Sequence, residues 1–178
     1  MAQAKNNCNH GTLQKWLPLT IVNLDSIPQS IDLDLVNKIK VYDLVFLGSL
    51  MESLCVEKNG VGLSAFQVGI PLPFFVASKD GKKFAYYYEC DYEGRGELID
   101  SIEGCLSILD GEGLPRRFLI KRFKNVKCKG KRINFQGDVC FEEFSETFDD
   151  MLSIVLQHEI DHQKPVLISE IGKEISII

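Results

Sequence analysis

The segment that most constrains this chain lies near its end, where an apolar run leads directly into a cluster of histidine and acidic residues. Residues 151–156 are almost all apolar, and Gln157-His-Glu-Ile-Asp-His162 follows at once. The pattern predicts a helix from Ser145 to about Gln163, with Ser145 as its N-cap and Pro165 ending it. A helix this apolar must be deeply buried, so the remainder of the fold has to enclose it.

His158 and His162 are four residues apart, so on a helix they project from one face, one turn apart. Two imidazoles placed in this way can bind one ion at roughly 2.0–2.1 Å each. Glu159 can reach a metal-bound water, whose proton a carboxylate can accept and return. Two of the three histidines in the chain belong to this motif. Since an unpaired imidazole in an apolar helix is costly, the motif indicates a metal centre rather than surface decoration.

Two histidines require a third protein ligand. Gln163 and Lys164 follow the second histidine, so the form with a third histidine downstream is absent. Glu170 and Glu174 remain, but a return helix is hard to place after Pro165. We therefore expect the third ligand to lie upstream of the helix.

The order of helix, several strands and helix predicts an α+β fold, with mainly antiparallel sheets around the central buried metal-binding helix. The expected elements are a strand at 17–24, a helix from Asp32 or Asp34 to about Lys58, strands at 74–77 and 84–88 joined by a turn at 79–82, a polar loop at 90–97, and two or three strands within 114–141 with a turn at 129–131. Residues 1–16 are expected to be a flexible leader, and residues 17–178 a single catalytic domain.

The composition of the chain argues against some classes of binding partner. The net charge of −5 argues against nucleic acid as the main partner. The basic run from Arg116 to Arg132 favours a solvated strand pair, with a phosphate-contacting patch as the alternative. No segment has the ~20 apolar residues of a membrane span, and the first residues resemble neither a signal nor a transit peptide, so no membrane partner is expected. The six cysteines are then expected to be thiols.

Three motifs, in this order, resemble those of the peptide deformylase family. They are Gly60-Val-Gly-Leu-Ser-Ala-Phe-Gln67, Glu103-Gly-Cys-Leu-Ser107 and Gln157-His-Glu-Ile-Asp-His162, against the family patterns GxGLAAxQ, EGCLS and QHExDH. One motif is moderately specific, whereas the three together are very specific. The resemblance implies the fold of that family, with Cys105 as the third metal ligand, bound as a thiolate.

Without the resemblance, Cys105 would be read as a buried core thiol. With it, one cysteine and two histidines leave one coordination position open for water or substrate, which is typical of a catalytic site. In the family the metal in the cell is usually Fe²⁺, and Zn²⁺, Ni²⁺ or Co²⁺ can replace it. The ligands alone do not select among these metals.

The resemblance also implies the reaction, which is removal of the formyl group from the N-terminal formylmethionine of nascent proteins, with release of formate. A metal-bound hydroxide attacks the formyl carbon, and Glu159 acts as general acid and base. The oxyanion is stabilised by the side-chain amide of Gln67 and the backbone N–H of Leu106.

For the substrate, the resemblance implies that the backbone of Val61 and Gly62 pairs with the peptide as an added strand. The methionine pocket would be formed by Val61, Leu106, Met151, Ile154, Val155 and the aliphatic part of Glu103. From the residues alone, Ile154 and Val155 would be assigned simply to the core.

The chain departs from the family pattern in several places. Leu109 replaces the usual proline, and Pro115-Arg116 matches the family's Val-Pro-Arg only after a gap. The loop at 109–114 lacks an arginine that could hold the peptide. The tail also lacks the long basic helix by which many bacterial members dock on ribosomes, so ribosome association is a weak expectation.

We expect a monomer in the cytoplasm of a bacterial or phage-infected cell, with an organelle as the alternative. Two other functions stay open from the residues. One is another zinc-dependent hydrolase or peptidase of the HExxH type, and the other is an inactive peptide-binding module.

Overall fold

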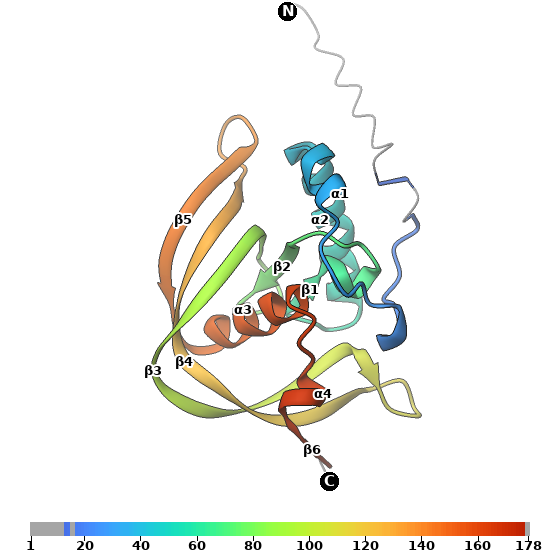
Figure 1. Ribbon diagram of the computed structural model, residues 1–178, viewed down its shortest axis with the longest axis vertical. Helices are drawn as coiled ribbons and strands as arrows, with labels where there is room; N and C mark the ends of the chain where they lie inside the picture. Colours follow the sequence, from blue (N-terminus) through green and yellow to red (C-terminus); the bar gives the residue numbers. More distant parts are fainter. Residues whose placement is uncertain (1–12, 15–16, 177–178) are drawn as a thin grey trace, which may run out of the picture.

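Helix α3 (Asp150–Gln163) lies at the centre of the fold, and the other elements are arranged around it (Figure 1). The structure is a computed structural model that describes residues 13–14 and 17–176. One antiparallel sheet has the strand order β1-β2-β3-β4-β5, and β6 pairs with β4. The expected α+β architecture is therefore confirmed, although the strands form one sheet.

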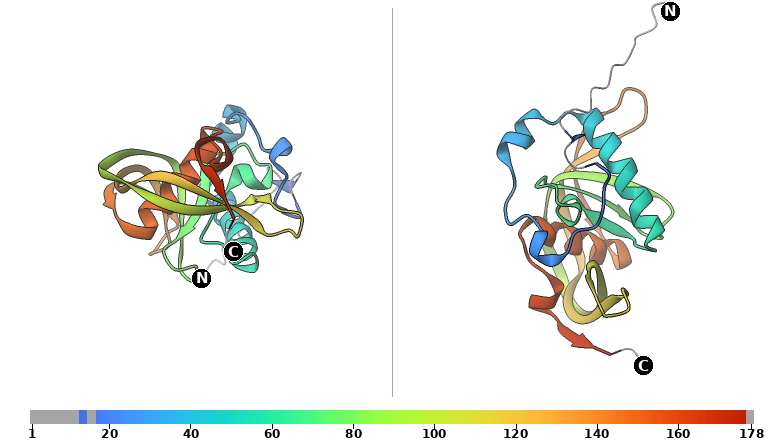
Figure 2. Two further views of the ribbon diagram at one scale, coloured as in Figure 1. Left: turned by 90° about the horizontal axis from the view of Figure 1, so that it is seen from below. Right: turned by 90° about the vertical axis from the view of Figure 1, so that its right-hand side faces the viewer.

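Two very long strands shape this sheet. Figure 2 shows β3 and β4 as one long curved ribbon that bends round α3. Register shifts in the β3–β4 pairing accompany the bends, because an extra residue in one strand increases local twist. The elements are η3 (Leu24–Ser26), α1 (Leu33–Lys38), α2 (Val41–Glu57), β1 (Gly62–Ser64), η4 (Ala65–Val68), β2 (Phe74–Ser78), β3 (Phe84–Leu109), β4 (Pro115–Asn134), β5 (Cys140–Phe148), α3, α4 (Ile168–Ile171) and β6 (Lys173–Ile175).

The predicted start of α3 was wrong by one turn. Its N-cap is Asp149, whereas Ser145 lies in β5 and pairs with Lys129 of β4. Residues 141–148 contain Phe141, Phe144 and Phe148, and aromatic residues favour a strand. This preference outweighs the tendency of Ser145 to cap a helix. The end of the helix before Pro165 is as expected.

The long N-terminal helix is in fact two helices. Asp32 caps α1 by accepting a hydrogen bond from the Leu35 N–H at 3.0 Å, as predicted. The chain then becomes extended at Ile39 and Lys40, and α2 begins at Val41. The carboxylate of Asp43 accepts the Lys40 N–H at 3.0 Å, which is a second helix-start signal that the apolar spacing concealed.

Three other local predictions were also wrong. Residues 90–97 are strand rather than loop, and Lys129-Gly-Lys131 is not a turn. A Cβ at Gly130 would lie 2.5 Å from the Cys90 Sγ, so this glycine allows close approach of β3 and β4 within a continuous strand. Residues 17–23 form no strand, although the Val22 N–H donates to the Gln67 carbonyl at 2.8 Å.

The basic run lies in β4. Lys121 and Lys124 are exposed and pair with acidic residues of β3, and Arg132 is partly exposed and pairs with β5. Of the predicted leader, Leu13 is buried in the main core, and residues 1–12, 15 and 16 lie outside the described residues. Within the described part of the chain, no helix is long and apolar enough to cross a membrane.

Replacement of a buried leucine of α2 is expected to destabilise the fold strongly. Leu44 is fully buried, so Leu44→Ala should lower the free energy of unfolding by about 2–5 kcal/mol through lost burial and the cavity left behind. Leu33→Ala is the matched control, because Leu33 is 70% exposed and its loss should cost under about 1 kcal/mol. Urea unfolding measures both values, and equal effects would contradict the core assignment.

Candidate metal centre

The ligand atoms of Cys105, His158 and His162 all lie within 4.8 Å of one another. The Sγ of Cys105 is 3.5 Å from the Nε2 of His162, and the two imidazole centroids are 4.9 Å apart. A tetrahedral ion with ordinary metal–sulfur and metal–nitrogen bond lengths would separate these two donor atoms by about 3.6 Å. The donor set therefore fits a metal ion with protein ligands from β3 and α3.

Local irregularity in β3 presents the cysteine to the helix. β3 pairs regularly with β4 from Leu98 to Gly104, which lies opposite Arg117, and the register then shifts before Leu109. Cys105 lies within this irregular stretch and is almost completely buried. It packs with Ile108 and with residues of β4 and α4, so the thiol is held in a defined position.

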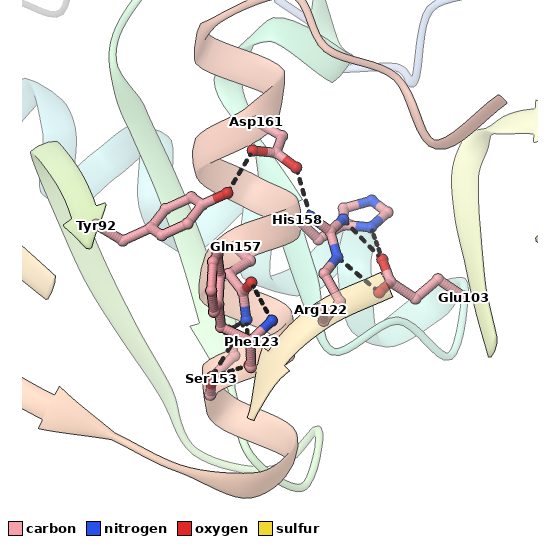
Figure 3. Close-up of polar contacts among 8 residues, drawn as sticks. All are labelled: Tyr92, Glu103, Arg122, Phe123, Ser153, Gln157, His158 and Asp161. Carbon is pink, nitrogen blue, oxygen red and sulfur yellow. Dashed lines mark hydrogen bonds and ion pairs between the residues drawn. The ribbon is translucent and has the colours of Figure 1, made fainter. Parts of the chain in front are cut away.

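Glu103 and Arg122 support the first histidine from below (Figure 3). The Nδ1 of His158 is 2.9 Å from the Glu103 carboxylate, and the Arg122 guanidinium holds that carboxylate with two bonds of 2.8 and 3.0 Å. When Nδ1–H donates to a carboxylate, Nε2 is left free to bind a metal. This contact thus sets both the tautomer and the direction of the ring.

Arg122 also contacts α3 directly. Arg122 Nη1 donates to Asp161 at 2.5 Å, and the Tyr92 hydroxyl donates to the other oxygen of Asp161 at 3.2 Å. Burial raises the pKa of Glu103, but hydrogen bonds from His158 and Arg122 outweigh it and lower the pKa to about 2. Glu103 is therefore a carboxylate at neutral pH.

Arg122 was expected among the solvated basic residues, but it is buried. The sequence did contain a signal for this burial. Phe118, Ile120 and Arg122 are alternate residues of one strand, so they face the same side, and the first two are apolar and buried. Arg116, matched in the sequence to the family's arginine, is instead exposed and pairs with Glu174 of β6. Glu103 was predicted to contribute only its aliphatic part to a pocket. The contacts of its carboxylate with His158 and Arg122 were not predicted.

Gln67 directs its side-chain amide toward the cluster. Its Nε2 is 3.2 Å from the Cys105 Sγ and 3.4 Å from the Ser107 Oγ, while its Oε1 accepts the Ser64 N–H at 2.9 Å. Because Oε1 is occupied by the backbone, the NH₂ group is the end that faces the metal ligands. The short helix η4 thus presents an oriented hydrogen-bond donor at the site.

Glu159 is buried beside the two histidines, and its Oε2 has no hydrogen-bond partner among the described residues. A Cβ at Gly62 would overlap the Glu159 carboxylate, so β1 can approach α3 only with glycine at this position. Burial raises the pKa of Glu159 to about 7. Burial also lowers the pKa of His162, which favours the neutral imidazole that a metal requires.

The predicted substrate residues are divided between two environments. Val61 and Val155 belong to one cluster beneath β1, and Val155 contacts the position where a Gly62 Cβ would lie. Leu106 lies next to Gly60 and packs against the other main hydrophobic cluster, which contains Leu44 and Met51. Ile154 is partly buried, and Met151 is half exposed in the first turn of α3.

Comparison with known proteins shows what this arrangement is related to. The family model described as polypeptide deformylase matches residues 31–174. A peptide deformylase from Heliobacterium modesticaldum is 34% identical over 124 residues, which is 68% of this chain and 74% of the relative. The chain belongs to the polypeptide deformylase family. It is therefore an enzyme of the peptide deformylase class, which are hydrolases that act in translation.

Solved structures agree with this relationship. The crystal structure of a peptide deformylase from Thermotoga maritima superposes with a TM-score of 0.70 at 26% identity, covering 87% of this chain and 97% of that one. A second, from Synechococcus elongatus in complex with actinonin, has a TM-score of 0.70 at 23% identity, with 88% of this chain and 79% of that one covered. The second likeness concerns the fold alone.

Removal of the thiol should abolish metal binding. Cys105→Ala deletes one of three donor atoms, so the metal content of the purified protein should fall from about one ion per chain to below about a tenth. Cys140→Ala is the matched control, because Cys140 is exposed and lies outside the cluster. Elemental analysis measures both, and full metal content in Cys105→Ala would exclude this cysteine as a ligand.

Loss of Arg122 should affect both stability and the metal. Arg122→Ala leaves two buried carboxylates uncompensated, so it should cost about 3–5 kcal/mol in unfolding free energy. Metal affinity should fall about 10–100-fold, because Glu103 is no longer held against His158. Arg95→Ala removes an exposed ion pair with Glu93 and should cost less than about 1 kcal/mol. Similar losses in the two variants, by urea unfolding, would contradict the role of the network.

Proposed function

We propose that this chain removes the formyl group from the N-terminal formylmethionine of nascent proteins and releases formate. The observation that carries the proposal is the Gln67 amide, oriented by Ser64 and donating to Cys105 within a Cys/His/His cluster. A hydrolase acting on a formyl amide needs a donor for the oxyanion next to the metal, and Gln67 can supply it. Membership of the family supports the same reaction.

The proposed metal in the cell is Fe²⁺, held by Cys105, His158 and His162, and Zn²⁺, Ni²⁺ or Co²⁺ can replace it. When bound, such an ion polarises the formyl oxygen and lowers the pKa of a water molecule at the site. The thiolate and the two neutral imidazoles leave a position open to this water and the substrate.

Glu159 is proposed to be the general acid and base. Its unpartnered Oε2 is buried next to the ligands, so it can accept a proton from the attacking water. The same oxygen then delivers the proton to the amine nitrogen that leaves as the C–N bond breaks. Confinement against Gly62 holds the carboxylate in place for both transfers.

The remaining residues are proposed to stabilise the oxyanion and hold the substrate. Gln67 Nε2 and the backbone N–H of Leu106 donate to the oxyanion. β1 is the edge strand of the sheet, so the backbone at Val61 and Gly62 can pair with an extended peptide. The methionine side chain is proposed to lie among Val61, Leu106, Met151, Ile154, Val155 and the aliphatic part of Glu103.

The partner is then a formylmethionyl peptide, which is the substrate of the proposed reaction. We place the reaction in the cytoplasm of a bacterial or phage-infected cell, with the enzyme as a monomer. Stable ribosome association is not part of the proposal.

A peptidase of the HExxH type is the competing function. Its hallmark is a His/Glu/His motif that works without Cys105 and Gln67. Here Cys105 contacts His162 and Gln67 contacts Cys105, which favours the deformylase reaction. If Cys105→Ala kept its metal and hydrolysed peptide bonds, the peptidase assignment would replace ours.

Formate release from formyl-Met-Ala-Ser by the anaerobically iron-loaded or nickel-loaded enzyme tests the proposal. Glu159→Gln should lower kcat by about 10²–10⁴-fold, because the amide cannot carry the proton, while the metal content stays unchanged. Glu143→Gln is the control, since Glu143 is exposed in β5. A folded, metal-loaded wild-type enzyme that releases no formate would refute the proposed function.

A further inference from the structure

The hydroxyl of Tyr92 makes a polar contact with α3 to which the proposed reaction assigns no role. Tyr92 lies in the first half of β3, close to the register shift between Tyr88 and Asp91. Its hydroxyl donates to the Oδ1 of Asp161 at 3.2 Å (Figure 3). Asp161 directly precedes the candidate ligand His162, so this contact joins β3 to the helix that carries both histidines.

The two oxygens of the Asp161 carboxylate are held by different donors. Oδ1 accepts from Tyr92, and Oδ2 accepts from the Arg122 Nη1 at 2.5 Å. Asp161 is almost completely buried, so bulk water has little access to these contacts. With the Arg122 contact alone, the carboxylate can rotate about its Cβ–Cγ bond, because such terminal torsions are only weakly restricted. The Tyr92 hydroxyl is the second contact that restricts this rotation.

Arg122 transmits the position of Asp161 to the first histidine. Its guanidinium contacts Asp161 through one nitrogen and the Glu103 carboxylate through the other two, at 2.8 and 3.0 Å. Because the guanidinium is planar, a shift of one carboxylate tilts the contacts with the other. Glu103 in turn lies 2.9 Å from the His158 Nδ1. A continuous series of contacts therefore leads from the Tyr92 hydroxyl to the ring of His158.

β3 thus contacts α3 at two places, and Figure 3 shows Tyr92 and Glu103 on opposite sides of the helix. Lys164, the C-cap of α3, has its Nζ 5.4 Å from the centroid of the Tyr92 ring and 2.7 Å from the Asp91 carboxylate. The ring is therefore restrained independently of its hydroxyl. Burial raises the pKa of Tyr92 to about 12, so the phenol stays protonated at neutral pH and donates to Asp161.

We propose that Tyr92 is a positioning residue of the candidate metal centre, and that its hydroxyl fixes the direction of the His158 ring through Asp161, Arg122 and Glu103. Groups that orient a metal-binding histidine raise metal affinity, because the ligand is already directed at the ion. The proposal concerns how the ligands are held, so it applies to any metal bound there and to any bond that the centre hydrolyses.

Removal of the hydroxyl alone tests the proposal. Tyr92→Phe keeps the ring beside Lys164, and circular dichroism checks that the variant folds. We expect its affinity for Zn²⁺, measured by competition with a chelator, to fall about tenfold, the lower end of the range for groups that orient a metal-binding histidine. The visible absorption of the Co²⁺-loaded variant should also shift, because it reports the coordination geometry. Tyr42→Phe is the matched control, since Tyr42 is 47% exposed on α2 and should keep both wild-type values.

A merely structural bond between β3 and α3 predicts a different result. Tyr92→Phe would then lower the midpoint of urea unfolding, while Zn²⁺ affinity stayed within about twofold of wild type and the Co²⁺ spectrum was unchanged. That outcome would overturn the proposal. None of these measurements uses a peptide, so a negative result here is distinct from a failure to release formate, which bears on the proposed function alone.

A double variant tests the route through Asp161. Asp161→Ala removes the acceptor, so adding Tyr92→Phe to it should change Zn²⁺ affinity by less than about twofold, because the two residues act in one series of contacts. A further loss of about tenfold in the double variant would mean that Tyr92 acts by another route, and it would overturn the proposal.

Discussion

The burial of the Arg122 guanidinium between two carboxylates is the interaction on which the rest of the structure depends. Glu103 comes from β3, Arg122 from β4 and Asp161 from α3, and all three are almost completely buried. Charged groups removed from water are tolerated only when they are paired and hydrogen-bonded. If β3 or β4 shifted relative to the other strand or to α3, one of these ion pairs would break. A buried charge would then be left without its partner.

This network also determines the geometry of the metal centre. Glu103 holds His158 through Nδ1, and Asp161 lies in the same helix, one residue before His162. The third member of the candidate metal centre, Cys105, is two residues after Glu103 on β3. The contacts that keep the charges paired therefore also place the ligands, and a catalytic site gains the rigid support that precise proton transfer needs.

Two different contacts shape the side of the candidate site that faces β1 and η4. Gly62 lets the edge strand come close to Glu159, and Ser64 orients the amide of Gln67 through its backbone. The leucines at the tip of the β3–β4 hairpin form one wall of a neighbouring cavity.

Local patterns in the sequence were a poor guide to element boundaries in the sheet. The strand at Phe74–Ser78 and the N-cap at Asp32 were predicted, because each depends on a few neighbouring residues. The continuity of β3 and β4 was not, since glycines and charges that usually indicate turns are accommodated by pairing partners distant in the sequence. The break between α1 and α2 was hidden for a similar reason, because apolar spacing continues across it.

The sequence by itself determined the His158/His162 pair with Glu159, because helical periodicity is a local property. It also made Cys105 and Gln67 candidates, but only through resemblance to a family. Only the tertiary structure decided that Cys105 meets His162, that Gln67 meets Cys105, and that Arg122 is buried rather than solvated. The physical reason is that such contacts join residues far apart in the chain, and their energies depend on burial that no local pattern records.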